Sequence, residues 1–160
     1  MLSESVLRPR YELLYHLSPV LSQCVAAAAG ESCVGLYRFS VANSGLEAQE
    51  RVRVAWPAQF AGWQVDWDSS DLVASAQRRE EPEIGMSNDG QFAHEIRNLA
   101  PNTLVEFAVR CGDCTRAELE AARQAAVHVE AHGKLLEGEP RMTVLGRAAT
   151  NAARVVGIFF

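Results

Sequence analysis

The stretch that decides the fold runs from Val34 to Trp56 and reads V-G-L-Y-R-F-S-V-A-N-S-G-L-E-A-Q-E-R-V-R-V-A-W. On both sides of the turn sequence Asn43-Ser44-Gly45, apolar side chains alternate with polar ones. The apolar positions are Tyr37, Phe39 and Val41 before the turn and Val52, Val54 and Trp56 after it. Such alternation around a turn is typical of two antiparallel strands that bury one face. The stretch therefore predicts an antiparallel pair at the centre of an all-β sandwich.

Length, composition and charge set the limits of the interpretation. The chain has 160 residues, 48% of them hydrophobic, which is enough to bury a core and excludes a disordered chain. We therefore expect a single domain over residues 1–160, with a β-sandwich core at 11–140 and a terminal segment at 142–160. The net charge of −5 argues against nucleic acid as a partner, because nucleic-acid binders usually carry excess positive charge.

Six further segments predict the remaining strands, most of them by the same alternation. They are Tyr11–Leu17, Trp63–Asp68, Leu72–Arg79, Gln91–Arg97, Thr103–Cys111 and Val127–His132. We expect the first strand to end near Ser18-Pro19, and the alanine-containing Leu21–Ser32 to form a loop or one helical turn. Turn residues cluster at Ser87–Gly90 and at Asn98–Asn102, where the chain is expected to reverse.

Two segments near the C-terminus have helical character. Thr115 and Glu118 have the spacing of a capping box, in which each side chain bonds the backbone of the other residue. This predicts a short helix at Ala117–Ala126. Met142–Phe159 carries apolar residues at helical spacing and predicts an amphipathic terminal helix, with a strand at Leu135–Val144 as the competing interpretation.

Together these patterns predict a mainly β protein, an antiparallel sandwich with a short helix after Cys114 and a C-terminal amphipathic helix. The runs Tyr37–Trp56 and Ile96–Arg110 resemble bacterial immunoglobulin-like modules of the cell-adhesion-related type, and the resemblance covers roughly Val34–Cys111. It implies an immunoglobulin-like sandwich used for adhesion, as a spacer or for docking a protein partner. Such modules share no catalytic residues, so the resemblance implies a non-enzymatic function and supplies no site residues.

The sharpest chemical motif is Cys111-Gly112-Asp113-Cys114. A predicted strand precedes it and a predicted helix follows, which is the local layout of a thioredoxin-like redox site whose helix N-terminus favours the thiolate. The alternative function is therefore a thiol–disulfide oxidoreductase with Cys111 and Cys114 as catalytic residues. Thioredoxin-like folds alternate strands with helices, whereas about 100 residues of β pattern precede the motif here. A local disulfide, or unreactive thiols at a strand end, is the simpler interpretation.

Cys24 and Cys33 complete a set of four cysteines, all of them disulfide candidates. Three pairings exist: Cys24–Cys33 with Cys111–Cys114 is the local one, and the two crossed ones would tie the first strands to the Thr103–Cys111 strand. Zinc would need all four thiolates around one ion, and one close pair with a partner pair nine residues apart is poor zinc spacing. We expect no metal or cofactor. An even number of cysteines in a β-rich chain favours an oxidising compartment, outside the cytoplasm or at a membrane, whereas the absence of a recognisable secretory signal favours the cytoplasm, so both locations stay open.

Three further groups have both a structural and a functional interpretation. Trp56, Trp63 and Trp67 with Phe60 could form an aromatic platform for a glycan or peptide, but their alternation favours core packing. If His128-x-Glu130-x-His132 is a strand, its two histidines lie about 13 Å apart. One metal ion could then bind at most two neighbouring residues of the three, so a solvated face is favoured. The apolar C-terminus, residues 155–160, either packs on the domain or leads to membrane association.

Overall fold

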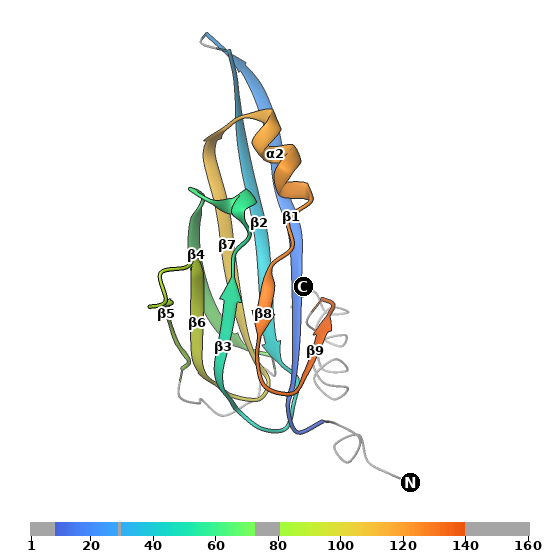
Figure 1. The fold of residues 1–160 in the computed structure, drawn as a ribbon. Helices are drawn as coiled ribbons and strands as arrows, with labels where there is room; N and C mark the ends of the chain where they lie inside the picture. Colours follow the sequence, from blue (N-terminus) through green and yellow to red (C-terminus); the bar gives the residue numbers. More distant parts are fainter. Residues whose placement is uncertain (1–8, 29, 73–80, 140–160) are drawn as a thin grey trace, which may run out of the picture.

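The computed structural model describes residues 9–28, 30–72 and 81–139 of the chain. Within these residues the fold is mainly β, as predicted, and nine strands form two sheets (Figure 1). The strand order is β4-β7-β2-β1-β9 in the five-stranded sheet and β5-β6-β3-β8 in the four-stranded sheet. Neighbouring strands are antiparallel, except that β1 and β9 run parallel.

The two sheets are built from the following strands. The five-stranded sheet contains β1 (Glu12–Ala27), β2 (Gly30–Asn43), β4 (Gln64–Asp71), β7 (Thr103–Cys114) and β9 (Lys134–Glu137). The four-stranded sheet contains β3 (Gln49–Ala55), β5 (Glu83–Met86), β6 (Ala93–Leu99) and β8 (His128–Glu130). A 3-10 turn, η1 (Ala58–Phe60), follows β3, and helix α2 (Arg116–Arg123) follows β7.

One hydrophobic core lies between the two sheets. Trp56, which directly follows β3, packs its ring edge-on against Phe39 of β2 and Phe107 of β7, with ring centroids 5.6 and 5.2 Å apart. Phe39 and Phe107 are almost completely buried, as are Val52 and Ile96 from the opposite sheet. Because side chains of both sheets interdigitate in one cluster, the two layers stabilise each other as in a sandwich.

The structure corrects the predicted antiparallel pair within Val34–Trp56. β2 pairs with β1 and β7, whereas β3 pairs with β6 and β8, so the two strands lie in opposite sheets and face each other across the core. The buried Asn43 side chain holds the connection between the layers by donating to the carbonyl oxygens of Glu47 and Leu99 and accepting from the Gly45 amide. Strands that face each other and strands that are neighbours both bury one face, so alternation alone cannot distinguish them.

The structure also corrects the start of the chain. β1 does not end near Ser18-Pro19 but continues to Ala27, and Leu21–Ser32 is neither a loop nor a helical turn. This segment forms a hairpin of β1 and β2 in which the pairing runs without a break from Leu21 opposite Leu36 to Ala27 opposite Gly30. Pro19 is tolerated because it lies at a register shift, where the chain can lose a ladder hydrogen bond.

The other predicted strands are confirmed with shifted ends: β4, β6, β7 and β8 match Trp63–Asp68, Gln91–Arg97, Thr103–Cys111 and Val127–His132. The capping box at α2 is also confirmed: the Thr115 hydroxyl accepts from the Glu118 amide, and Glu118 accepts from the Thr115 amide. β9 occupies part of the strand considered at Leu135–Val144. Most of the strand predicted at Leu72–Arg79, and the whole helix predicted at Met142–Phe159, lie outside the described residues.

Helix α2 covers the inner face of the five-stranded sheet where the hairpin of β1 and β2 leaves the core (Figure 1). Its buried Leu119 packs on Gly35 of β2, where an added Cβ atom would lie 2.7 Å from a Leu119 methyl carbon and 2.8 Å from the Trp63 ring. Gly35 therefore permits the close approach of helix and sheet. Within the described ranges, no helix has both the length and the apolar character needed to cross a membrane.

Candidate functional site: a hairpin arm and a row of cysteines

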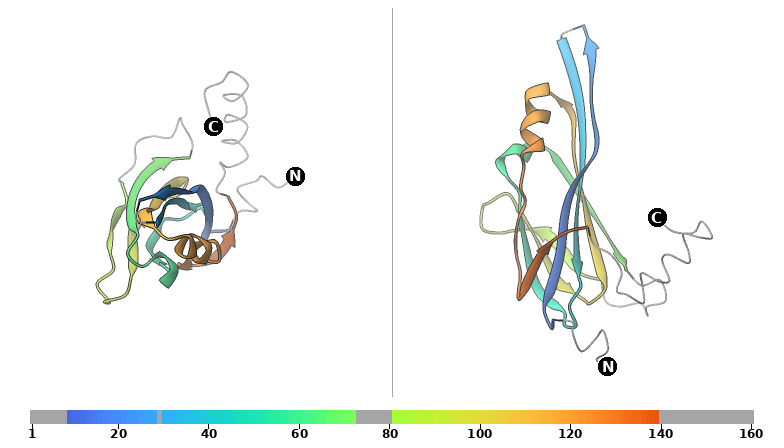
Figure 2. Two further views of the ribbon diagram at one scale, coloured as in Figure 1. Left: turned by 90° about the horizontal axis from the view of Figure 1, so that it is seen from above. Right: turned by 90° about the vertical axis from the view of Figure 1, so that its right-hand side faces the viewer.

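The hairpin of β1 and β2 projects beyond the rest of the molecule. We call residues 20–28 and 30–36 the hairpin arm; its tip rises past α2 and past the end of the four-stranded sheet in the right-hand view of Figure 2, while Cys33, Gly35 and Leu36 at its base also pair with β7. An antiparallel hairpin alone is marginally stable in water, so an arm of this length needs a brace. Two features of the site supply it: a disulfide within the arm and α2 at its base.

The arm is apolar and almost uncharged on its surface. Val20, Leu21 and Val25 are 48%, 44% and 56% exposed, although side chains of this size are usually buried. Glu31 is the only charged residue among residues 20–36. Its carboxylate accepts two hydrogen bonds from the Arg116 guanidinium of α2, at 3.0 and 2.7 Å, so that charge is already paired. The arm therefore presents apolar surface without the charges that usually protect a projecting strand.

One edge of β1 in the arm carries no neighbouring strand among the described residues. β2 pairs along β1 from Leu13 to Ala27, whereas β9 pairs only with Glu12–Tyr15 on the other edge. Beyond Tyr15, the second edge of β1 thus offers backbone N–H and C=O groups in extended geometry. Such an edge is the template on which another extended segment can pair.

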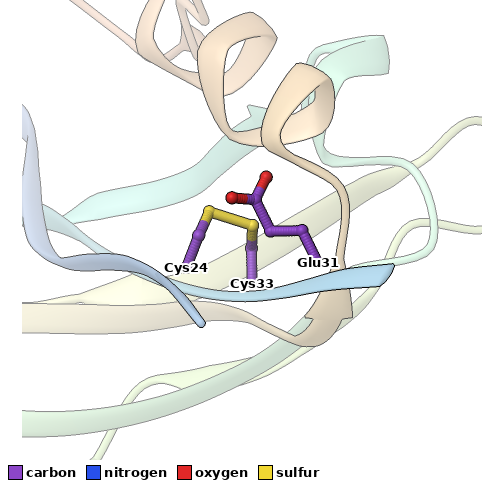
Figure 3. Close-up of side chains that lie close together, drawn as sticks. All are labelled: Cys24, Glu31 and Cys33. Atoms are coloured by element: carbon purple, nitrogen blue, oxygen red, sulfur yellow. A yellow bond between two sulfur atoms is a disulfide. The ribbon is translucent and has the colours of Figure 1, made fainter. Parts of the chain in front are cut away.

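A disulfide between Cys24 and Cys33 joins the two strands of the arm. Figure 3 shows it on the same side of the hairpin as Glu31, beneath the start of α2. The two sulfur atoms and a Glu31 carboxylate oxygen all lie within 4.8 Å of one another. Because the sulfurs are bonded to each other and the carboxylate is bonded to Arg116, these three groups act here as a brace between the arm and α2.

Cys111 and Cys114 carry free thiols and lie beside this brace. Cys114 of β7 is the direct partner of Cys33 on β2, and its Sγ donates to the Cys33 carbonyl oxygen at 3.4 Å. Cys111 lies opposite Gly35. The register shifts between the pair Cys33–Cys114 and the pair Gly35–Cys111, because two residues of β7 but only one of β2 lie between them. Cys24, Cys33 and Cys114 therefore form a row across three adjacent strands, β1, β2 and β7.

Cys114 is a buried thiol that resists ionisation. Burial raises the pKa of Cys114 to about 12, and a hydrogen bond with Cys111 and the negative charges of Glu118 and Asp113 add to the effect. β7 lies between β4 and β2, antiparallel to both, and not as a parallel strand flanked by helices. The strand-then-helix layout predicted for Cys111 and Cys114 is present locally, but it lies among antiparallel strands and not in the alternating strands and helices of a thioredoxin-like fold.

The tryptophan interpretation is correct in part. Trp56, Trp63 and Phe60 are buried in the core, as expected. Trp67 is 44% exposed, so the expected core packing is incomplete at this residue. Trp67 belongs to β4, the last strand at one edge of its sheet. From there its ring contacts the ring of His94 on β6, with centroids 5.2 Å apart.

A shallow hollow of about 320 Å³ lies over β2, β4 and β7 and extends to Val20 of the arm. Ion pairs run across these strands: Arg38 bonds Glu106, and Arg110 bonds Asp66, each with a closest N–O distance of 3.1 Å. These side chains are substantially exposed, so the pairs contribute little stability and leave the charged atoms accessible. The hollow therefore joins the apolar arm to a surface with charges of both signs.

The His128-x-Glu130-x-His132 sequence does not converge on one point. His128 and Glu130 are exposed neighbours, with Nε2 and Oε1 3.6 Å apart. The His132 ring instead packs edge-on against Tyr11, with centroids 4.3 Å apart. The sequence thus places these residues on strand β8 and the loop after it, where they have structural contacts.

Sequence reasoning missed the arm and one buried polar pair. The arm could have been recognised because Cys24 and Cys33 flank the run A-A-A-A-G, as partners on the two strands of a hairpin would. The buried pair is Trp56 and His94: the indole Nε1–H donates to His94 Nδ1 at 2.7 Å. Its only sequence signal is a histidine in an inward-facing position of β6.

Comparison with protein-family models and with curated proteins gives no match for this sequence.

Proposed function

We propose that this chain is a non-enzymatic immunoglobulin-like module that docks a protein partner through the hairpin arm. The observation that carries the proposal is the arm itself: a projecting strand edge with exposed Val20, Leu21 and Val25 and a single, already paired charge. The sequence resemblance of Tyr37–Trp56 and Ile96–Arg110 to adhesion-type modules, and the two facing sheets, support the same class of protein.

The expected occupant is an extended segment of a different protein, with apolar side chains at alternate positions. The edge of β1 that has no neighbouring strand among the described residues can bond the backbone of such a segment, and Leu21 and Val25 give it apolar contacts. A highly charged segment fits poorly because the arm offers it no free opposite charge. Docking by strand addition obtains affinity from the backbone and specificity from alternate side chains.

The disulfide gives the arm a second functional property. Cys24–Cys33 holds β1 and β2 in register before any partner arrives, so less conformational entropy is lost on docking. A disulfide of this kind persists in an oxidising compartment, which supports the expectation of a location outside the cytoplasm. Membrane association through residues 155–160 stays a prediction, because those residues lie outside the described ranges.

Site-specific photo-crosslinking tests the proposal directly. A photoreactive amino acid is placed at Leu21 or Val25, and at Met86 as the control; Met86 is 55% exposed on β5 of the other sheet. After irradiation in the producing cells, we expect the same protein to be captured from both arm positions and not from Met86. The captured protein should then bind the purified module, and Val25→Glu should weaken that binding at least tenfold while Met86→Glu does not.

Two results would overturn the proposal. One is equal capture from Met86 and from the arm, or no capture from the arm at all. The other is a dimer of this chain, seen by sedimentation, that dissociates in the Val25→Glu variant, because the arm would then serve self-association.

A further inference from the structure

The cysteine row continues from the arm into the body of the sheet. Cys24, Cys33 and Cys114 are cross-strand partners on β1, β2 and β7, so their side chains share the inner face of the sheet. Cys33 and Cys114 are buried, with 0% and 3% of their surface exposed. Cys111 adds a fourth sulfur next to the row: it lies three residues before Cys114 on β7, and Cys114 Sγ donates to its carbonyl oxygen at 3.9 Å.

The order of the row suits disulfide exchange. A thiolate attacks a disulfide sulfur from the side opposite the departing sulfur, through a mixed disulfide. Cys33 is the central residue, with Cys24 on one neighbouring strand and Cys114 on the other. An attack from Cys114 on the Cys33 sulfur therefore comes from the required side, and Cys24 leaves toward β1.

We infer that the row Cys24, Cys33 and Cys114, completed by Cys111, is an internal thiol–disulfide exchange site that can move the disulfide from the arm to β7. In the first step Cys114 loses its proton to solvent and attacks Cys33 Sγ; the Cys33–Cys114 bond forms, the Cys24–Cys33 bond breaks, and Cys24 leaves as a thiolate that takes up a proton. In the second step the Cys111 thiolate attacks Cys114 Sγ, and Cys33 leaves. One disulfide and two thiols are present throughout, so no oxidant or reductant is consumed.

The exchange has a structural consequence for the arm. While Cys24 and Cys33 are bonded, the two strands of the arm are tied together. A Cys33–Cys114 bond would instead tie β2 to β7 and leave β1 in the arm held only by its backbone pairing. This inference goes beyond the proposed docking function and does not rest on it, because the exchange needs no partner.

The pH dependence of the first step follows from the surroundings of Cys114. The titratable groups that act on it are Cys111 and Asp113 on its own strand and Glu118 on α2, all of which oppose a further negative charge. Glu31 of β2 lies on the same face and is held by Arg116 of α2. Because the pKa of Cys114 is raised to about 12, its thiolate fraction and the exchange rate should increase about tenfold per pH unit up to that value.

Non-reducing peptide mapping tests the inference on the whole chain. The oxidised protein is incubated anaerobically without added thiol at about pH 7.5 and 9.5, quenched with acid, alkylated and digested with trypsin and a protease that cleaves after glutamate. Cleavage after Glu31 separates Cys24 from Cys33, whereas Cys111 and Cys114 stay together in the tryptic peptide Cys111–Arg116. The Cys24–Cys33, Cys33-linked and Cys111–Cys114 forms therefore differ in mass, and fragmentation of the linked peptide identifies which cysteine is bonded to Cys33. We expect Cys33–Cys114 or Cys111–Cys114 bonds to appear about 100-fold faster at the higher pH.

Variants separate the two steps. Cys111→Ser removes the second attack, so the mixed Cys33–Cys114 disulfide should accumulate, while Cys114→Ser should keep Cys24–Cys33 as the only disulfide at both pH values. Folding of each variant is checked by its tryptophan fluorescence. Cys24–Cys33 alone at both pH values in the folded wild-type chain would overturn the inference. So would exchange that reaches a plateau near pH 8.5, because it would come from an exposed thiol, or unchanged exchange in Cys114→Ser.

Discussion

Lowering the pH from 7 to 5 should destabilise this protein through one buried side chain, His94. The imidazole is 2% exposed, lies between the sheets against Trp56, Trp67 and Phe107, and accepts a hydrogen bond at Nδ1 from the Trp56 indole. Because an indole N–H can only donate, Nδ1 must be unprotonated in the folded state. Protonation would place two donors against each other in an apolar core.

The direction of the effect follows from the pKa. Burial lowers the pKa of His94 below the ordinary value of 6.5 in the folded protein. Between the folded and unfolded pKa values the unfolded chain binds more protons, so stability falls as the pH falls below about 6.5. The loss approaches about 1.4 kcal/mol per pH unit and totals about 2 kcal/mol between pH 7 and 5 for as long as the folded imidazole stays neutral.

Urea denaturation followed by tryptophan fluorescence at pH 7, 6 and 5 measures this loss. The matched variant is His94→Phe, which cannot titrate, so its free energy of unfolding should change much less over the same range. Glu31, Asp89 and Glu95 have lowered pKa values because of hydrogen bonds from Arg116, Gln91 and Arg97, respectively. Their contributions are present above the unfolded pKa values, 4.5 for Glu31 and Glu95 and 3.8 for Asp89, and are lost as the pH falls through the lowered folded values. An equal loss of stability in His94→Phe and the wild type would refute the reasoning.

Three further predictions concern packing, capping and the disulfide. Gly35→Ala forces a Cβ atom against Leu119 and Trp63 and should lower the free energy of unfolding by about 1–3 kcal/mol. The control Gly112→Ala meets no atom within 4 Å and should change it by less than about 0.5 kcal/mol. Equal effects of the two variants in urea denaturation would show that the packing of α2 is wrongly described. Thr115→Ala should cost about 1 kcal/mol by removing the cap of α2, and Thr115→Ser should restore most of it; no difference between the two in thermal unfolding would contradict the capping role. Reduction of Cys24–Cys33 should lower stability by about 2–3 kcal/mol on the chain-entropy estimate for a separation of nine residues, and a melting temperature that is the same with and without reductant would contradict that estimate.

The sequence predicts which residues are buried better than it predicts which strands are neighbours. Tyr37, Phe39, Val52 and Val54 are all inward, as their alternation indicates. That alternation reports only the burial of one face, which is the same for two strands in one sheet and for two strands in facing sheets. The layer to which each strand belongs is decided by long-range pairing, such as β2 with β7 and β3 with β6, and no local pattern encodes it.

The candidate site was predictable only in its parts. The four cysteines were visible, but the row they form depends on β2 lying between β1 and β7. The arm was misinterpreted because alanines and glycine around residue 28 have weak strand propensity, and the cross-strand pairing of β1 and β2 overrides it. Trp67 alternates like a core residue, but its strand lies at the edge of the sheet, where an inward side chain is only half covered.

The arrangement of β2 between β1 and β7 carries both the arm and the cysteine row, and it can be measured directly. Interstrand backbone nuclear Overhauser effects in the isotope-labelled protein report which strands are neighbours. We predict contacts that link Phe39 to Phe107 and Val54 to His94, with Cys33 linked to both Cys24 and Cys114. Backbone contacts between Phe39 and Val54 as strand neighbours would contradict the account, because β2 and β3 would then form the hairpin that this fold separates into two sheets.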